Sequence, residues 1–126
     1  MIDPGKVKIF FLYYIPILVW MGVIFYLSSV PNLKTGAAIP IEFFSRKIAH
    51  LTEYAILAGL FARALRIYQL DFKRIFVFSL VGVLIFSSSD ELHQLFVIGR
   101  SGNFFDVGVD LLGAIGGLLI FKKIAG

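Results

Sequence analysis

The sequence predicts an all-α integral membrane protein, a bundle of four transmembrane helices with an outward-facing polar pocket. The first observation is composition. Of the 126 residues, 59% are hydrophobic and 16% are charged, whereas soluble domains have about 45–50% apolar and about 25% charged residues. The second is that the apolar residues form unbroken runs instead of an amphipathic stripe. The third is that ionisable residues gather where these runs meet.

Four apolar segments are long enough to cross a membrane, which takes roughly 20 residues as a helix. Within one domain, 1–126, they cover residues 9–30, 48–70, 75–98 and 104–121. The first is uncharged, and we expect Pro16 to kink it; it is too long for the apolar region of a signal peptide. Between the spans we expect a loop over 31–47 and turns over 71–74 and 99–103.

The basic residues are distributed unevenly between the two ends of this bundle. With four spans both termini lie at one end, and that end holds Lys6, Lys8, Arg63, Arg66, Lys73, Arg74, Lys122 and Lys123, eight of the twelve basic residues. Cytoplasmic loops carry the excess of Lys and Arg. We therefore expect both termini in the cytoplasm. The absence of cysteine excludes a disulfide framework and a thiolate metal site.

From one predicted span to the next, the ionisable residues alternate between the first and the second half of the span. They lie in the first half of the second span, the second half of the third and the first half of the fourth: His50 and Glu53; Asp90, Glu91 and His93; Asp106 and Asp110. Because neighbouring spans run in opposite directions, all of them are expected in the outer half of the bilayer. At about 1.5 Å per residue their depths also agree, at about 9–12 Å from the span ends. Intramembrane charges mark candidate functional sites.

Helical spacing groups these residues into faces. Lys47, His50 and Tyr54 share one face, Ser87, Asp90, Glu91 and Gln94 form a second stripe, and Asp106, Asp110, Gly113 and Gly117 share a third. The last two form a G-x-x-x-G pair, which allows another helix to approach closely.

Two segments resemble the VanZ-like family of membrane proteins. They are RKIAHLTEYAILAGL (46–60) and DELHQLFVIGRSGNFFDVGVDLLGAIGG (90–117). The matched positions are Lys47, His50, Glu53, Tyr54, Asp90, Glu91, His93, Gln94, Phe96, Gly99, Arg100, Asp106, Gly113 and Gly117. Two positions depart from the pattern: Ile98 replaces the usual proline, and Asp110 replaces the usual asparagine and adds a carboxylate.

The resemblance implies a multi-pass protein of the bacterial cytoplasmic membrane that is linked to the cell envelope. The family is named for a protein that lowers sensitivity to the glycopeptide antibiotic teicoplanin. It implies no particular mechanism, so the chemistry has to be argued from the residues.

Three interpretations of the polar residues remain open. One is a divalent metal ion, whose candidate ligands are His50, His93, Glu91 and Asp106. Another is acid/base catalysis by His50 and His93, each with a carboxylate, Glu53 or Asp90, within helical reach. The third is a salt-bridged bundle without a ligand. Against it, five carboxylates outnumber the three cations expected nearby, Arg46, Lys47 and Arg100.

The protein is expected to bind a membrane lipid or a lipid-linked cell-wall precursor at the outer leaflet. Hydrolysis or group transfer of that molecule is the expected further step. Candidate catalytic residues are His50, His93, Glu53, Asp90 and Glu91, and candidate substrate-binding residues are Lys47, Tyr54, Gln94, Arg100, Asp106 and Asp110. The residues leave open whether the protein is an enzyme or a non-catalytic binding and shielding protein. A small transporter is disfavoured because span 9–30 has no carboxylate and alternating-access sites lie near the midplane. No nucleic-acid partner is expected, and the sequence does not specify an oligomeric state.

Overall fold

The described chain is helical throughout. A computed structural model describes residues 3–29, 39–96 and 104–125. Its elements are α1 (Pro4–Ile9), the π-helix η1 (Phe10–Tyr14), α2 (Ile15–Ser29), α3 (Ile39–Leu65), the 3-10 helix η2 (Arg66–Tyr68), α4 (Phe72–Gln94) and α5 (Phe105–Ala125). No strand occurs among these residues. The predicted all-α class is confirmed.

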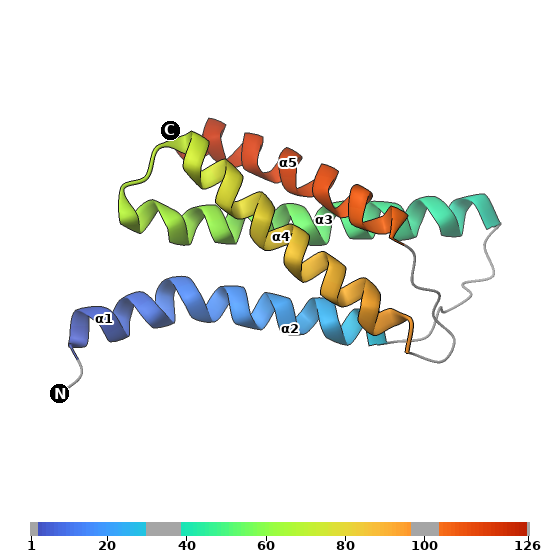
Figure 1. The fold of residues 1–126 in the computed structure, drawn as a ribbon, viewed down its shortest axis with the longest axis horizontal. Helices are drawn as coiled ribbons and strands as arrows, with labels where there is room; N and C mark the ends of the chain where they lie inside the picture. The colour runs from blue at the N-terminus through green and yellow to red at the C-terminus, as the bar shows by residue number, and fades with distance from the viewer. Residues whose placement is uncertain (1–2, 30–38, 97–103, 126) are drawn as a thin grey trace.

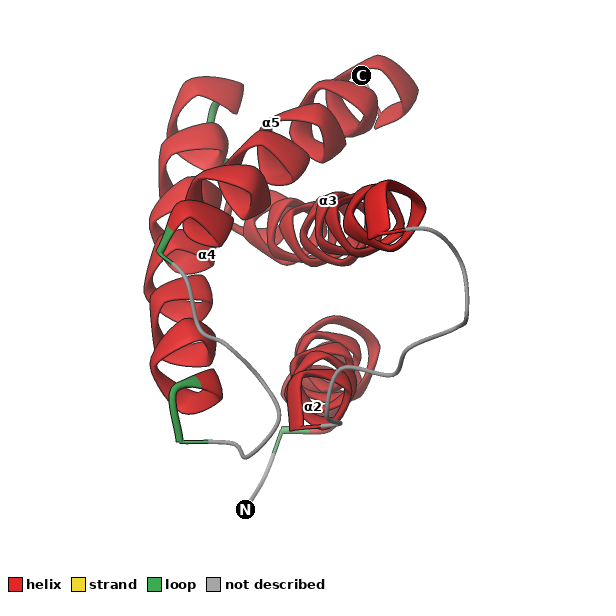
Figure 2. Cartoon of the chain, turned by 90° about the vertical axis from the view of Figure 1, so that its right-hand side faces the viewer, coloured by secondary structure: helices red, strands yellow, loops and turns green. Residues whose placement is uncertain are grey.

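The helices pack as a bundle in which α3 is central. Helix α3 contacts α5 most extensively and also packs against α4 and α2 (Figures 1 and 2). The start of α1 and the end of α5 lie at the same end of the bundle, on the left of Figure 1. Fully buried apolar side chains between the helices, among them Leu57, Val83 and Leu118, form the core.

The bundle has the helix lengths and outer surface of a multi-pass membrane protein. Of the described residues, Pro4–Ser29, Phe44–Tyr68 and Phe72–Gln94 form three helices long and apolar enough to cross a membrane. Large apolar side chains such as Leu18 and Ile85 face outward, as lipid-facing residues do. Helix α5 is 21 residues long, carries charges near both of its ends, and remains a prediction as the fourth span.

The predicted loop over 31–47 is wrong for its last part, because α3 begins at Ile39. Pro40, which indicated a loop, is the second residue of this helix. Proline is tolerated in the first helical turn, where its missing N–H would have no intrahelical partner. As a consequence Lys47 is held on a helix. Residues 30–38 lie outside the described part of the chain.

The other helix boundaries also differ from those predicted. Helix α3 ends at Leu65 and is followed by η2 and by Gln69 in the left-handed conformation, with φ of 58°. Helix α4 begins inside the expected turn 71–74, because the Asp71 side chain caps it by accepting a hydrogen bond from the Arg74 amide at 3.2 Å. Helix α5 extends to Ala125, beyond the predicted end at 121.

A π-helical segment, η1, ends two residues before Pro16, whereas the kink expected at Pro16 stays a prediction. In an α-helix the amide of residue 16 would donate to the Leu12 carbonyl, but proline has no N–H. Arg63 Nη1 on α3 donates to that carbonyl at 2.6 Å, and its guanidinium lies 4.5 Å from the centre of the Tyr13 ring. The freed carbonyl thus helps to attach the first helix to α3.

Candidate functional site

Close packing of α3 and α5 sets the register of the polar residues between them. Gly113 and Gly117 are buried against α3. A Cβ at Gly113 would lie 2.8 Å from Leu51 Cα, and one at Gly117 would lie 2.8 Å from Ala55 Cα. The G-x-x-x-G pair is therefore confirmed as a site of close backbone approach. Its register brings the preceding turns of α5 beside the first half of α3.

In this register the histidine of α3 is paired with a carboxylate of α5. His50 Nδ1 lies 2.7 Å from Asp110 Oδ1, and Ser87 of α4 donates to Asp110 Oδ2 at 2.6 Å. Asp110 is fully buried. One turn further toward the end of the bundle, Lys47 forms an ion pair with Asp106. The sequence nominated Glu53 to orient His50, whereas the structure puts Asp110 at its Nδ1.

A second buried carboxylate connects three helices. Asp90 on α4 accepts a hydrogen bond from Ser28 of α2 at 2.6 Å, one from Gln94 of α4 at 3.3 Å and one from Tyr54 of α3 at 3.5 Å. Asp90 is 1% exposed. Three donors on one desolvated carboxylate tie α2, α3 and α4 together.

Sequence reasoning overlooked Ser28. Its hydroxyl also lies 3.4 Å from His93 Nδ1, so Ser28 stands between His93 and Asp90. The His93 ring packs against Phe25, with 5.0 Å between the ring centroids. The available signal was the Ser28–Ser29 pair, which ends an otherwise apolar span. A serine side chain in hydrocarbon needs a partner, and another helix can supply it.

A cavity of about 250 Å³ opens beside these carboxylates. Its polar lining comprises Ser28, Arg46, His50, Glu53, Asp90 and Gln94. It lies toward the end of the bundle opposite the termini, since it draws on the end of α2, the first half of α3 and the end of α4. Trp20 of α2 donates to the Glu53 carbonyl at 2.9 Å and so helps to hold α2 against α3 at this point.

Most of the nominated site residues therefore lie in or beside one polar region. His50, Glu53, Asp90 and Gln94 line the cavity, and Tyr54, Asp110 and His93 each contact a residue that lines it. Lys47 and Asp106 pair with each other one helical turn before His50 and Asp110. Glu91 is buried on α4. Arg100 lies outside the described residues. Arg46, expected from the sequence only as a nearby cation, lines the cavity directly.

One group of side chains brings three potential metal ligands together. His50, Glu91 and Asp110 offer ligand atoms that all lie within 4.8 Å of one another. Imidazole and carboxylate together suit Zn²⁺ or Mn²⁺. Of the candidate ligands chosen from the sequence, His50 and Glu91 belong to this group, and His93 and Asp106 do not. Their place is taken by Asp110, the residue that departs from the VanZ-like pattern.

The pairing of His50 also determines which of its nitrogens is available. When the ring is neutral, its proton lies on Nδ1 and is donated in a hydrogen bond to the Asp110 carboxylate, which can only accept. Nε2 then carries the free lone pair and can accept a proton or bind a metal. An asparagine at position 110 could accept the same hydrogen bond through its carbonyl oxygen, but it would supply no charge.

Spanning-length helices around a buried histidine–carboxylate network define a multi-pass membrane protein with an intramembrane polar site. The chain belongs to the VanZ/LLP1 family, whose family model matches residues 11–125. Membership supports a cell-envelope protein of the glycopeptide-resistance type. Comparisons with curated proteins and with solved structures each found no match.

Proposed function

We propose that this protein binds a lipid or lipid-linked cell-wall intermediate at the outer leaflet and modifies it by hydrolysis or group transfer. The observation that carries the proposal is the cavity in which Arg46, His50 and Asp90 meet between membrane helices. Buried ionisable groups are costly in a membrane, which favours a functional reason for their presence. The excess of Lys and Arg at the termini supports a cytoplasmic location for both termini and an outward-facing cavity.

The anionic head of such a substrate would meet cations at the cavity. Arg46 lines it, and Lys47, paired with Asp106, follows on the same helix. Guanidinium binds phosphate through two parallel hydrogen bonds. Arg100 is proposed as a third cation on the basis of sequence alone. Tyr54 and Gln94, which donate to Asp90, complete the proposed binding residues.

His50 is proposed as the general base. With Nδ1 bonded to Asp110, its Nε2 accepts the proton of a water or alcohol as that oxygen attacks phosphorus. His93, held by Ser28 beside Asp90, gives a proton to the leaving oxygen as the old bond to phosphorus breaks. Glu53 and Glu91 adjust the charge around the two histidines.

Incubating the purified protein with the lipid that copurifies with it tests this proposal. We expect mass spectrometry to show that the wild type converts the lipid to a product. His50→Ala and His93→Ala should retain the lipid unchanged, with rates lower by roughly 10²–10⁴-fold, the usual contribution of a general acid or base. Thr52→Ala is the matched control, because Thr52 is exposed on the same helix and its hydroxyl donates to the Ile48 carbonyl of that helix at 2.9 Å.

The second candidate is a protein that binds or shields the same lipid without altering it. The observation in its favour is that Asp90 and Asp110 already have hydrogen-bond partners within the bundle. Conversion of the lipid by the wild type would reject this candidate. Unchanged lipid in every sample would reject catalysis and leave binding. In that case teicoplanin sensitivity of cells carrying each variant would measure the shielding.

A metal-assisted form of the reaction would use His50, Glu91 and Asp110 as ligands. A divalent ion held there would act as a Lewis acid toward a phosphate oxygen. We expect elemental analysis of the purified protein to find zinc or manganese, and Asp110→Asn to lose most of it, since the amide is a poorer ligand than the carboxylate. Asp71→Asn, which alters a helix cap far from the site, should retain the metal. Native protein without bound metal would contradict the metal-assisted form only.

A further inference from the structure

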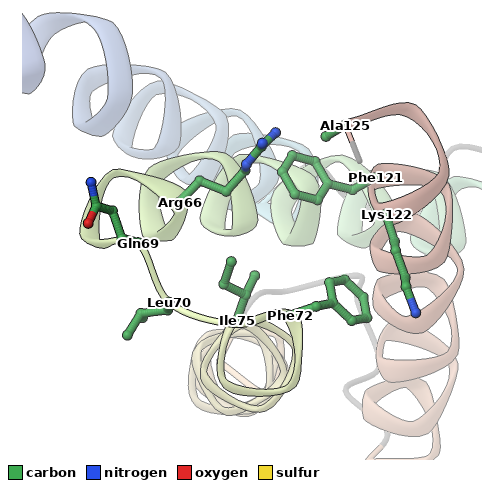
Figure 3. Close-up of a pocket in the computed structure, with 8 residues that line it drawn as sticks. All are labelled: Arg66, Gln69, Leu70, Phe72, Ile75, Phe121, Lys122 and Ala125. Carbon is green, nitrogen blue, oxygen red and sulfur yellow. The ribbon is translucent and has the colours of Figure 1, made fainter.

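The opposite end of the bundle contains a second cavity that the proposed function does not use. It has a volume of about 400 Å³ and lies where η2 and the residues after it, the start of α4 and the end of α5 meet (Figure 3). Arg66 and Lys122 line it, together with Leu70, Phe72, Ile75 and Phe121. A cavity of about 260 Å³ adjoins it and shares Arg66 and Phe121. This region is the end of the molecule that bears both termini.

The electrostatics of this end favour an anion. Eight basic residues lie there, against two acidic ones, Asp3 and Asp71, among the residues described. Each acid caps a helix: Asp3 accepts from Gly5 N at 2.9 Å, and Asp71 from Arg74 N at 3.2 Å. Asp71 also lies 3.8 Å from the Arg74 side chain. Within the described chain, therefore, no carboxylate neutralises Arg66 or Lys122.

The cavity combines apolar and aromatic side chains with three polar ones, Arg66, Gln69 and Lys122, all of which are exposed. The Arg66 guanidinium lies 5.9 Å from the centre of the Phe121 ring, and Lys122 Nζ lies 4.9 Å from that of Phe72. Figure 3 shows Arg66 with Phe121 on one side and Ile75 with Phe72 on the other. Ile75 is buried. A free phosphate would leave these walls in water, whereas a lipid would cover them.

We propose that this cavity binds one anionic phospholipid of the adjacent leaflet. In Figure 3 the Arg66 and Lys122 side chains point to different sides of the cavity. Both are exposed, so on binding they turn toward the phosphate group, and the glycerol and upper acyl carbons cover Phe72 and Phe121. Basic pockets between transmembrane helices are known to take anionic lipid head groups in this way, and aromatic side chains are typical of the membrane interface. The site is independent of the proposed outer-leaflet chemistry and goes beyond it.

Native mass spectrometry of the full chain, released from nanodiscs, tests the proposal. In nanodiscs of phosphatidylglycerol mixed with phosphatidylcholine, we expect the wild type to retain phosphatidylglycerol selectively. The double variant Arg66→Gln/Lys122→Gln should retain at least tenfold less. The matched control is Lys73→Gln/Lys123→Gln, which removes the same charge from the same end at residues that do not line the cavity; it should bind as the wild type does.

Two further experiments test the alternatives to a bound phospholipid. A charge-preserving variant tests whether the loss is due to charge, and a soluble competitor tests whether a free phosphate would be enough. Arg66→Lys/Lys122→Arg keeps both charges and should restore retention, and melting temperatures in phosphatidylcholine alone verify that every variant is folded. Equal losses in the two Gln double variants would overturn the proposal in favour of general charge attraction. Displacement of the lipid by glycerol phosphate at similar concentration would also overturn it, since a free phosphate would then suffice. His50→Ala should retain phosphatidylglycerol normally, so this test and that of the outer site fail independently.

Discussion

Replacing Gly113 by valine is expected to be the most destabilising single change in this protein. A Cβ at this position would lie 2.8 Å from Leu51 Cα, and the atoms it meets belong to the backbone of α3, which cannot rotate away. The two helices would have to separate, at a cost of about 3 kcal/mol. Because the same contact sets the His50–Asp110 pairing, the polar network should be lost too. Thermal unfolding in detergent measures the effect.

Gly116→Val is the matched control for this prediction. Gly116 lies in the same helix, three residues further along, and a Cβ there would have no neighbour within 4 Å. Any general effect of valine on the helix is therefore present in both variants. Equal melting temperatures for the two variants would show that the close approach of α3 and α5 does not stabilise the fold.

Asp90→Ala is expected to lower both stability and activity. The substitution removes the acceptor of Tyr54 and Gln94 and the shorter of two hydrogen bonds of Ser28, whose hydroxyl also donates to the Phe25 carbonyl at 3.1 Å. A buried polar group that loses its partner costs about 1–3 kcal/mol, and rearrangement of the side chains should limit the total to about 3 kcal/mol. We expect loss of the anchor between α2, α3 and α4, seen as a lower melting temperature and as faster proteolysis.

Asp90→Asn separates the structural role of this residue from its chemical role. The asparagine carbonyl still accepts a hydrogen bond from Ser28, so most of the stability should return. The negative charge beside Ser28 and His93 is gone, so conversion of the copurified lipid should remain low. Recovery of both properties would mean that Asp90 is only a structural acceptor. Ser28→Ala, which removes the link between Asp90 and His93, should resemble Asp90→Asn in activity.

The helical class and a close helix contact at Gly113 and Gly117 were predictable from the sequence for a clear physical reason, although the partner helix α3 was not. A spanning helix satisfies its backbone hydrogen bonds internally, so its apolar run is sufficient to indicate it. Gly113 and Gly117, one turn apart, indicate close approach because glycine has no side chain. The boundaries were less predictable. Pro40 suits a loop and a first helical turn equally well, and Asp71 suits a turn and an N-cap.

The partners within the polar site were predictable only in part. Spacing along one helix suggested the pairs His50 with Glu53 and His93 with Asp90. In the structure His50 pairs with Asp110, and Ser28 stands between His93 and Asp90. Local spacing describes neighbours on one helix, whereas these contacts cross between helices. They depend on helix rotation and register, which side-chain packing decides.

By itself the sequence determined the family, the helical membrane class and the end of the bundle at which Asp90, Glu91 and Asp110 gather. These properties follow from apolar run length and from the positions of charges along each run. Only the tertiary structure decided that α5 carries the partner of His50, that α2 supplies Ser28, and that Arg66 and Lys122 border a common cavity. Such contacts join residues far apart in the chain, and they arise when four helices bury their faces against one another at fixed rotations.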